Sequence, residues 1–234
     1  FTFLSLFFFF FPVMIVMVMI VKTELFINPG SPEKNNDQML FLNRTKVQME
    51  GARASGFVNL GIIENYFREI APEGAMAFSR SSFTAVFLEN EVLDVPIRYT
   101  NADFWNIFDF HFVEGSHYNR DNVRQKDNVV VISRNLSEKL FGMQGAVGET
   151  MEVEGEMYRI IGVVEDITSL AMNAYSEIWL PYTIKSFKSY DPGEIARSAG
   201  GYRVTFKASD SWGFEQIQSD VERVRSRRNQ INGK

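Results

Sequence analysis

Two histidines with carboxylates close by are the first place where this sequence could carry chemistry. His111 and His117 are the only histidines of the chain, and Asp109 and Glu114 lie beside them in the sequence. A structural zinc site needs four ligands on rigid elements, whereas this stretch reads as the end of a short helix followed by a loop. The chain also has no Cys that could complete a ligand set. We therefore expect no metal site and place both histidines at the surface or half-buried.

A glycine series offers a second candidate, a cradle for phosphate groups. Gly142, Gly145 and Gly148 form a G-x-x-G-x-x-G pattern. A phosphate-binding loop follows a strand and opens a helix, whereas these glycines follow an expected helix and precede an expected strand. No Gly-Lys-Ser/Thr follows them. The pattern indicates a connection between a helix and a hairpin, and we expect no cofactor site.

Catalytic groups are equally hard to assemble from the remaining residues. The Asp and Glu residues are scattered, with no evident pair for acid–base work. A serine nucleophile would need one of the two histidines, and no Gly-x-Ser-x-Gly elbow is present. The net charge of −5 argues against a general nucleic-acid surface, which needs a basic patch. We expect neither enzymatic activity nor nucleic-acid binding.

The last expected helix ends in a cluster of arginines, which are Arg223, Arg225, Arg227 and Arg228. Positive charge at this end complements the helix dipole. The same charge would also suit contact with anionic lipid headgroups. The residues alone leave both interpretations open.

Residues 1–21 are the most apolar part of the chain. Eighteen of them are Phe, Val, Ile, Leu or Met, and none is charged. A helix of this length spans roughly 30 Å, the thickness of a bilayer hydrocarbon core. A buried soluble helix would show a polar face, and a cleaved signal peptide would show a basic start and a small-residue cleavage site. We therefore expect a transmembrane helix. The chain begins without Met, so we also expect it to be a fragment.

The rest of the chain reads as alternating strands and helices. Leu60, Ile63, Phe67 and Ile70 lie three and four residues apart, which predicts a helix over 57–70. Other helices are expected at 101–110, with Asn101 as its cap, at 134–141, capped by Ser133, and at 211–230. Strands are expected at 39–49, 75–87, 91–99, 128–132, 177–182 and 202–207, with a hairpin at 150–164. The stretches 51–56, 115–126 and 185–201 read as turns or loops.

A series of short motifs in the middle of the chain resembles a known family. Asp103–Gly115 is similar to an aromatic signature that runs from an Asp to a Gly in the MacB-type periplasmic core domain. Further similar pieces follow in that family's order, namely Val129–Ser133, Leu140–Gly142, Val147–Gly148, Val153–Gly155, Tyr158–Val164 with Asp166, and Ile178–Tyr182. Glu149 departs from the family, whose members often have Lys there.

The resemblance implies an α+β fold, with one N-terminal transmembrane helix followed by an extracytoplasmic domain of two α/β lobes. Residues 1–21 would be the helix, residues 22–100 and 183–234 a porter-like lobe, and residues 101–182 a small inserted lobe. The chain would be a fragment of an ABC transporter permease that couples cytoplasmic ATP hydrolysis to extracytoplasmic motion, for efflux or for lipoprotein or peptide export. It would lie in a bacterial inner membrane, with residues 22–234 in the periplasm.

The resemblance also implies partners and a role for the signature residues. The partners would be a cytoplasmic ABC ATPase, a second permease copy in a dimer or pseudo-dimer, and a periplasmic adaptor or outer-membrane protein. No catalytic residue is carried over, and the signature residues are expected to be structural; they are Asp103, Phe104, Phe108, Gly115, Phe141, Gly142, Gly148, Gly155, Gly162 and Pro181. The alternative is a membrane-tethered extracytoplasmic sensor or ligand-binding module, which explains the apolar segment equally well and the ordered motifs less well.

Overall fold

The computed structural model describes residues 14–19, 31–33, 36–43, 45–49, 52–87, 91–185 and 201–232. These residues include eleven strands: β1 (Met39–Leu42), β2 (Thr45–Met49), β3 (Ala52–Gly56), β4 (Met76–Phe87), β5 (Val92–Thr100), β6 (Phe112–Gly115), β7 (Val129–Ser133), β8 (Thr150–Val153), β9 (Glu156–Val164), β10 (Ile178–Pro181) and β11 (Arg203–Lys207). The helices are α2 (Leu60–Ile62), the π-helical turn η3 (Ile63–Phe67), α3 (Arg68–Ile70), α4 (Phe104–Ile107), α5 (Arg120–Gln125), α6 (Arg134–Phe141) and α7 (Phe214–Asn232), with a short 3₁₀ turn η2 (Asn36–Gln38) before β1.

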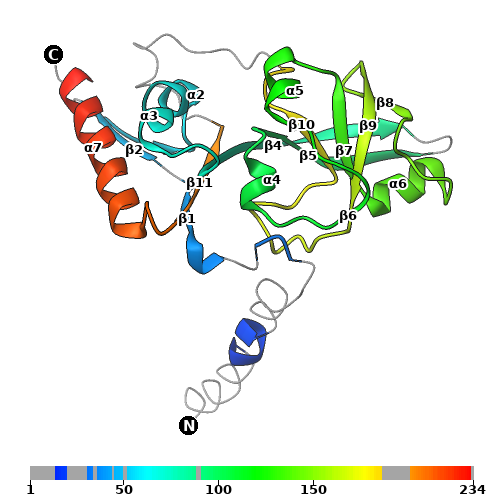
Figure 1. Cartoon of the computed structure of the whole chain (residues 1–234), viewed down its shortest axis with the longest axis horizontal. Helices are drawn as coiled ribbons and strands as arrows, with labels where there is room; N and C mark the ends of the chain where they lie inside the picture. The colour runs from blue at the N-terminus through cyan, green and yellow to red at the C-terminus, as the bar shows by residue number, and fades with distance from the viewer. Residues whose placement is uncertain are drawn as a thin grey trace.

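Nine strands form one mixed sheet that runs across the molecule (Figure 1). Its order is β1-β11-β4-β5-β10-β7-β9-β6, and β8 pairs with β9 beside this path. Two pairs are parallel, β5 with β10 and β7 with β9, and the others are antiparallel. Strands β2 and β3 form a separate hairpin. The α+β class expected from the sequence is what the structure shows.

The long β4–β5 hairpin joins the two ends of this sheet. Strand β4 pairs with β11 through Met76–Ser79, and β5 pairs with β10 through Ile97–Thr100. The two strands pair with each other from Ser79 and Thr100 to Phe87 and Val92. Strands from the expected porter-like lobe and from the expected inserted lobe therefore share one hydrogen-bonded sheet. The lobe boundaries themselves stay a prediction.

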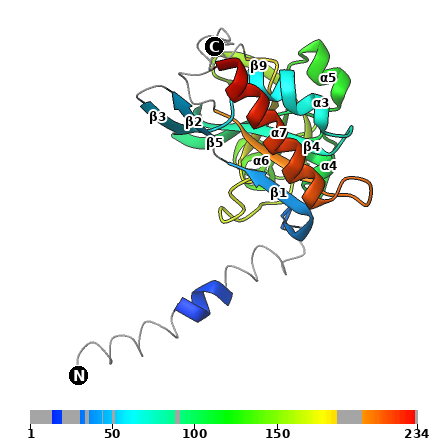
Figure 2. The ribbon, with the colours of Figure 1, turned by 90° about the vertical axis from the view of Figure 1, so that its left-hand side faces the viewer.

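Two helices cover the β1–β11 end of the sheet. The helix expected at 57–70 is present as α2, η3 and α3 in succession, and Asn59 caps it through a bond from the Gly61 N–H. It buries Ile62, Ile63 and Phe67, and the Phe67 ring meets Phe206 of β11 edge-on at 5.6 Å. Helix α7 lies across the same end (Figure 2) and buries Ile217 and Val224.

Two stretches that were expected to be turns or loops contain regular structure. Residues 51–56 are not a turn, because Ala52–Gly56 pairs with β2 and this pairing overrides the weak strand preference of its small residues. Residues 115–126 are not only a loop, because they contain α5, which is capped by Asn119; the Asn119 side chain accepts bonds from the Asp121 and Asn122 amides. The strand β6 at Phe112–Gly115 was missed as well.

The helix expected at 101–110 is shorter than predicted, and its expected cap has another role. Helix α4 ends at Ile107, since Phe108 already has an extended backbone. The Asn101 side chain does not cap it. Its amide instead donates to the Met76 carbonyl and accepts from the Phe78 N–H, which fixes the start of β4.

The expected transmembrane helix falls mostly on residues that the structure does not describe. Residues 14–19 are helical, with exposed side chains. Within the described part of the chain, no helix is long and apolar enough to cross a membrane. The expected loop at 185–201 also lies outside the described residues, except at its two ends.

Candidate functional site

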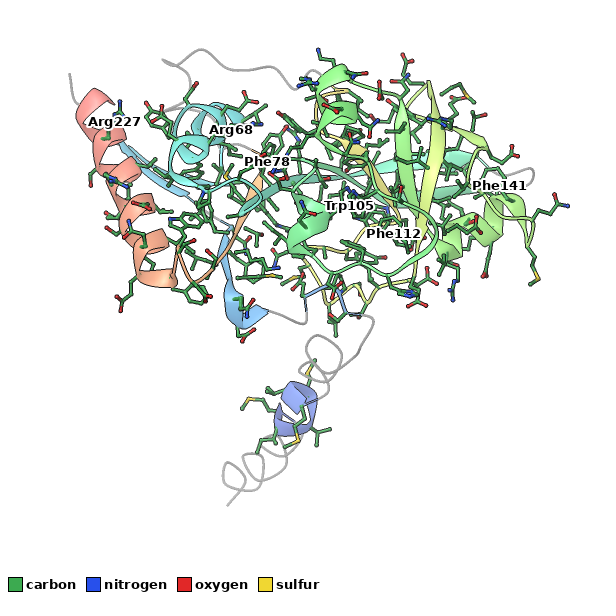
Figure 3. The ribbon with its side chains drawn as sticks, viewed as in Figure 1. Arg68, Phe78, Trp105, Phe112, Phe141 and Arg227 are labelled. Atoms are coloured by element: carbon green, nitrogen blue, oxygen red, sulfur yellow. The ribbon has the colours of Figure 1, made fainter. Side chains whose placement is uncertain are left out.

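The aromatic signature segment forms a packed cluster beneath α4. Phe104 and Phe108 are 0% and 1% exposed, and their ring centroids lie 4.7 Å apart. Phe110 is half-buried and meets both Trp105, at 5.0 Å, and Trp179 of β10, at 5.4 Å. Figure 3 shows Trp105 of α4 close to Phe112 of β6. The rings of this segment thus pack against one another and against Trp179.

Asp103, the first residue of the signature, ties three elements together. Its Oδ1 accepts from Arg120 Nε at 3.0 Å and Nη2 at 2.7 Å. Arg120, on α5, also pairs with Glu73 in the turn between α3 and β4. Burial raises the pKa of Asp103, and the positive charge of Arg68 counters this rise. The two ion pairs of Arg120 link the start of α5 to the start of α4 and to the turn before β4, and a cavity lies between these elements.

This cavity is a candidate ligand site in the described part of the chain. It has a volume of about 530 Å³ and lies between α3 with its following turn on one side and α4 and α5 on the other. Its lining combines arginines and acids with apolar side chains, among them Arg68, Glu73, Phe78, Asp103, Arg120 and Arg124. Arg68 donates to the Tyr182 hydroxyl and lies over the Phe78 ring (Figure 3). The charged groups largely satisfy one another, so the cavity has no evident reactive group.

Two signature glycines allow β6 and β9 to approach closely. A Cβ on Gly115 would lie 2.1 Å from the Ile161 carbonyl oxygen, and one on Gly162 would lie 2.4 Å from the Ser116 carbonyl oxygen. Both clashes are with backbone, which cannot swing aside. A side chain at either position would force the end of this sheet apart.

The other signature glycines lie at turns with positive φ. Gly142 ends α6 with φ +66, and its N–H donates to the Glu138 carbonyl. Gly148 precedes β8 with φ +100, and Gly155 has φ +86 in the hairpin between β8 and β9. Gly142 and Gly148 therefore lie in the helix-to-hairpin connection that the sequence predicted in place of a phosphate cradle.

The two remaining signature residues lie at element ends. Phe141 is the last residue of α6 and is half-buried (Figure 3). Pro181 ends β10, is buried, and pairs in register with Thr100 of β5. The structure thus places the ten signature residues around α4, α6 and the β5–β10–β7–β9–β6 part of the sheet, and not around one cavity.

The two histidines lie apart from any metal-binding group in the described part of the chain. His111 Nδ1 is 3.3 Å from Glu165 Oε1, and both side chains are open to solvent. The His117 ring stacks on Trp105 with 5.9 Å between centroids, and its Nδ1 lies 3.1 Å from the Tyr118 carbonyl oxygen. Among the described residues, no three His, Asp or Glu side chains come together as metal ligands.

Sequence reasoning missed one buried group of charges. Glu33 is 3% exposed and Arg98 is 2% exposed, although both read as ordinary charged residues in a linker and a strand. Arg98 carried a weak signal, because it interrupts the apolar end of a strand. Glu33 carried none, since its partners are 140 residues away in the sequence.

Comparisons with known proteins agree on one family. The model of the MacB-like periplasmic core domain matches residues 13–224. The macrolide export ATP-binding/permease proteins MacB of Shigella dysenteriae and Escherichia coli K12 are each 25% identical over 130 residues. That match covers 55% of this chain and 19% of each relative, so the chain spans a small part of these proteins.

Solved structures show the same fold. The periplasmic region of MacB from Actinobacillus actinomycetemcomitans has a TM-score of 0.59 at 16% identity, covering 82% of this chain and 85% of that one. The extracellular domain of the ABC-type transporter YknZ from Gram-positive bacteria has a TM-score of 0.54 at 14% identity, covering 77% and 88%. Because the family model covers most of the sequence, this chain belongs to the MacB-like periplasmic core domain family of ABC transporter permeases.

Proposed function

We propose that this chain is the membrane-anchored periplasmic part of a permease that passes ATP-driven motion across the inner membrane. The observation that carries the proposal is the family match over residues 13–224, which begins inside the apolar segment and ends within α7. Residues 1–21 are the anchor, and the folded part lies in the periplasm. The ATPase that supplies the motion is a separate domain or subunit in the cytoplasm.

The two expected lobes then serve as the moving parts. The porter-like lobe consists of residues 22–100 and 183–234, and the inserted lobe of residues 101–182. The cavity beside Asp103 lies between segments of both lobes, and the Arg120–Glu73 ion pair crosses it. The permease works as a dimer or pseudo-dimer with a periplasmic adaptor or outer-membrane partner, and it exports small molecules, peptides or lipoproteins.

Topology gives the first test. The chain has no Cys, so a single Asp37→Cys variant reports one exposed position close to the anchor. We expect a membrane-impermeant maleimide to label it in intact spheroplasts, and to label Glu222→Cys on α7 equally well. Labelling of either variant only after lysis would contradict a periplasmic location.

A ligand-binding sensor is the second candidate, and the 530 Å³ cavity favours it. The neighbouring reading frames distinguish the two functions. An adjacent ATPase with a Gly-x-x-x-x-Gly-Lys-Ser/Thr motif, together with three further hydrophobic segments in the parent chain, supports the permease. An adjacent kinase or response regulator supports the sensor.

A further inference from the structure

Residues 31–33 are buried against a part of the chain that is remote in sequence. Ser31 and Glu33 are 2% and 3% exposed, and Pro32 is buried between them. The Asp109 N–H donates to the Pro32 carbonyl at 3.1 Å. The amides of Asn173 and Ala174 donate to Glu33 Oε1 at 2.9 and 3.2 Å. The segment that follows the expected anchor is therefore docked on residues of the expected inserted lobe.

The loop that receives Glu33 is held from its other side by two arginines. Arg98 donates to the Tyr175 carbonyl at 2.8 Å and to the Met172 carbonyl at 3.1 Å. Arg203 Nη1 donates to the same Met172 oxygen at 2.8 Å. The loop thus turns its amides toward the carboxylate and its carbonyls toward the guanidinium groups. This polarity matches the charges on both sides.

The Glu33 carboxyl keeps hydrogen-bond donors and a positive charge around it despite its burial. Burial raises its pKa above the ordinary value of 4.5, and the two amide donors and the positive charge of Arg98 counter only part of this rise. A buried carboxylate that loses such partners costs several kcal/mol. Both amides donate to the same oxygen, Oε1, so an apolar side chain at this position would leave two donors without their acceptor.

The loop leads directly into the middle of the sheet. The Trp179 indole N–H, on β10, donates to the Ala174 carbonyl at 3.2 Å. The Ser176 hydroxyl and the Glu177 N–H both donate to the Pro96 carbonyl of β5. A displacement of the loop therefore acts on β10 and β5, the two strands at which the expected lobes meet.

We propose that Glu33 is a latch that couples the segment leaving the membrane to residues 172–174, so that movement of this segment reaches β10 and β5. The coupling rests on the proposed function, because it assumes that residues 1–21 are the moving anchor. The latch itself does not depend on that assumption.

The test uses the full 234-residue chain in detergent micelles at pH 7. Glu33→Ala removes the carboxylate, and Glu33→Gln keeps one acceptor oxygen but removes the charge. Asp37→Asn is the matched control, since Asp37 is an exposed acid in the same part of the chain. The readouts are amide hydrogen exchange at residues 173 and 174 and the indole N–H signals of the three tryptophans in a ¹⁵N spectrum.

We expect Glu33→Ala to speed exchange of the two amides by about tenfold or more and to shift the Trp179 indole signal, while Trp212 stays unchanged. Glu33→Gln should show the same changes to a smaller extent, and Asp37→Asn should show none. Unchanged exchange at residues 173 and 174 overturns the latch. Faster exchange without a Trp179 shift overturns the coupling. If the Trp212 signal also shifts in Glu33→Ala, that variant perturbs the whole domain, and Glu33→Gln is used in its place. In Glu33→Gln a Trp179 shift without a Trp212 shift supports the coupling, and any other result overturns it.

Protection of the segment gives an independent measure that does not involve the membrane. Ser31→Cys should react slowly with a maleimide in the parent background, because this side chain is buried. Adding Glu33→Ala should raise the rate toward that of Asp37→Cys. Equal rates in both backgrounds contradict the latch, whereas a failed topology test would contradict only the proposed function.

Discussion

At the scale of single residues, the signature residues lie where side chains pack closely or where the backbone takes a special geometry. Phe104 and Phe108, two of the residues expected to be structural, are both buried in the aromatic cluster. Gly115 and Gly162 lie where two strands approach too closely for a Cβ. Asp103 is the one signature residue with a charge, and it is bonded to Arg120. That these residues serve structure and not catalysis stays a prediction, which substitutions can test.

Phe108→Ala should destabilise the domain strongly. Its ring is fully buried against Phe104, so its loss leaves a cavity that the packed neighbours cannot fill. A large-to-small change of this kind costs about 3–5 kcal/mol. Chemical denaturation measures the loss, with Phe83→Ala as control because Phe83 is 66% exposed. A variant that unfolds like the parent but loses a partner would make the aromatic segment a binding surface.

Gly162→Ala should destabilise the domain by about 1–3 kcal/mol, as overpacking usually does. The added methyl group would meet the Ser116 backbone oxygen at 2.4 Å, so β6 must move away from β9. Gly213→Ala is the control, since a Cβ there meets nothing within 4 Å. We expect that control to be neutral or slightly stabilising. Equal midpoints for the two variants in urea would refute the close approach.

The buried charges mark where residue-level prediction fails. Sequence spacing shows which side chains lie on one face of one element, and it placed Ile63 and Phe67 on the buried face of their helix. Glu33 and Arg98 are buried because the chain brings residues 33, 98 and 172–175 together from three separate stretches. No local pattern contains such a contact. The same holds for the Asp103–Arg120–Glu73 group.

At the scale of elements, a hydrogen bond between Trp212 and Asp220, next to apolar side chains, holds the start of α7 in place. Trp212 packs edge-on against Phe206 of β11 at 5.6 Å. Its indole N–H donates to Asp220 Oδ2 at 3.0 Å, and Gln216 Nε2 donates to Oδ1 at 3.0 Å. Arg223 pairs with the same carboxylate. Asp220, in the second turn of α7, therefore holds Trp212, which lies two residues before the helix.

Asp220→Ala should destabilise α7 by about 1–3 kcal/mol, because it leaves the buried Trp212 donor without its acceptor. Urea denaturation followed by the fluorescence of Trp212, in a Trp105→Phe/Trp179→Phe background, measures this loss. Glu222→Ala is the matched control, since Glu222 is two residues away, exposed, and paired only with the exposed Arg225 among the described residues. A similar loss in both variants would show that general helix effects dominate.

Asp220→Asn separates the charge from the hydrogen bond through the pH dependence of stability. The Trp212 hydrogen bond, followed by contacts with Gln216 and Arg223, holds the pKa of Asp220 below its ordinary value of 3.8. The folded chain therefore binds fewer protons here than the unfolded chain. This stabilisation is complete above about pH 5 and is lost as the pH falls through the lower, folded-state pKa. Asp220→Asn should flatten the acid side of the stability curve, and an unchanged curve would contradict the assignment.

Elements with a strong period were predictable, and those made by pairing were not. The spacing of apolar residues predicted the helix at 57–70. Helix α6 begins after Ser133 and ends before Gly142, as expected. Strand β3 has little strand preference of its own and exists through its pairing with β2. Helix α5 has Asn122 where a capping box usually has Glu or Gln, so its start was not apparent.

At the scale of the whole molecule, the single sheet constrains how the expected lobes can behave. Strand β5 pairs with β4 along one edge and with β10 along the other. Tyr99 of β5 donates to Glu154 in the β8–β9 turn, which also pairs with Lys185 at 2.5 Å. The sequence predicted the α+β class and the order of most elements. It could not predict this continuity, because strand order depends on contacts between distant segments.

The continuous sheet predicts that both expected lobes unfold together. Trp179 and Trp105 lie in the inserted lobe and Trp212 lies in the porter-like lobe, so the three tryptophans of the chain can report each lobe separately. A Trp105→Phe/Trp212→Phe variant leaves Trp179 as the only reporter, and a Trp105→Phe/Trp179→Phe variant leaves Trp212. In each variant, the fluorescence transition in urea should coincide with the loss of circular dichroism, as in a two-state transition.

The physical reason is that neither lobe keeps a complete sheet without the other. Loss of β5 would expose the buried residues Ile178 and Trp179 of β10, together with one edge of that strand. Loss of β10 would in turn expose Ile97 and Tyr99 of β5. If the Trp212 fluorescence transition has its midpoint at a clearly lower urea concentration than the loss of circular dichroism, the porter-like lobe unfolds alone. Motion between the lobes would then come from local unfolding, and not from bending of an intact sheet.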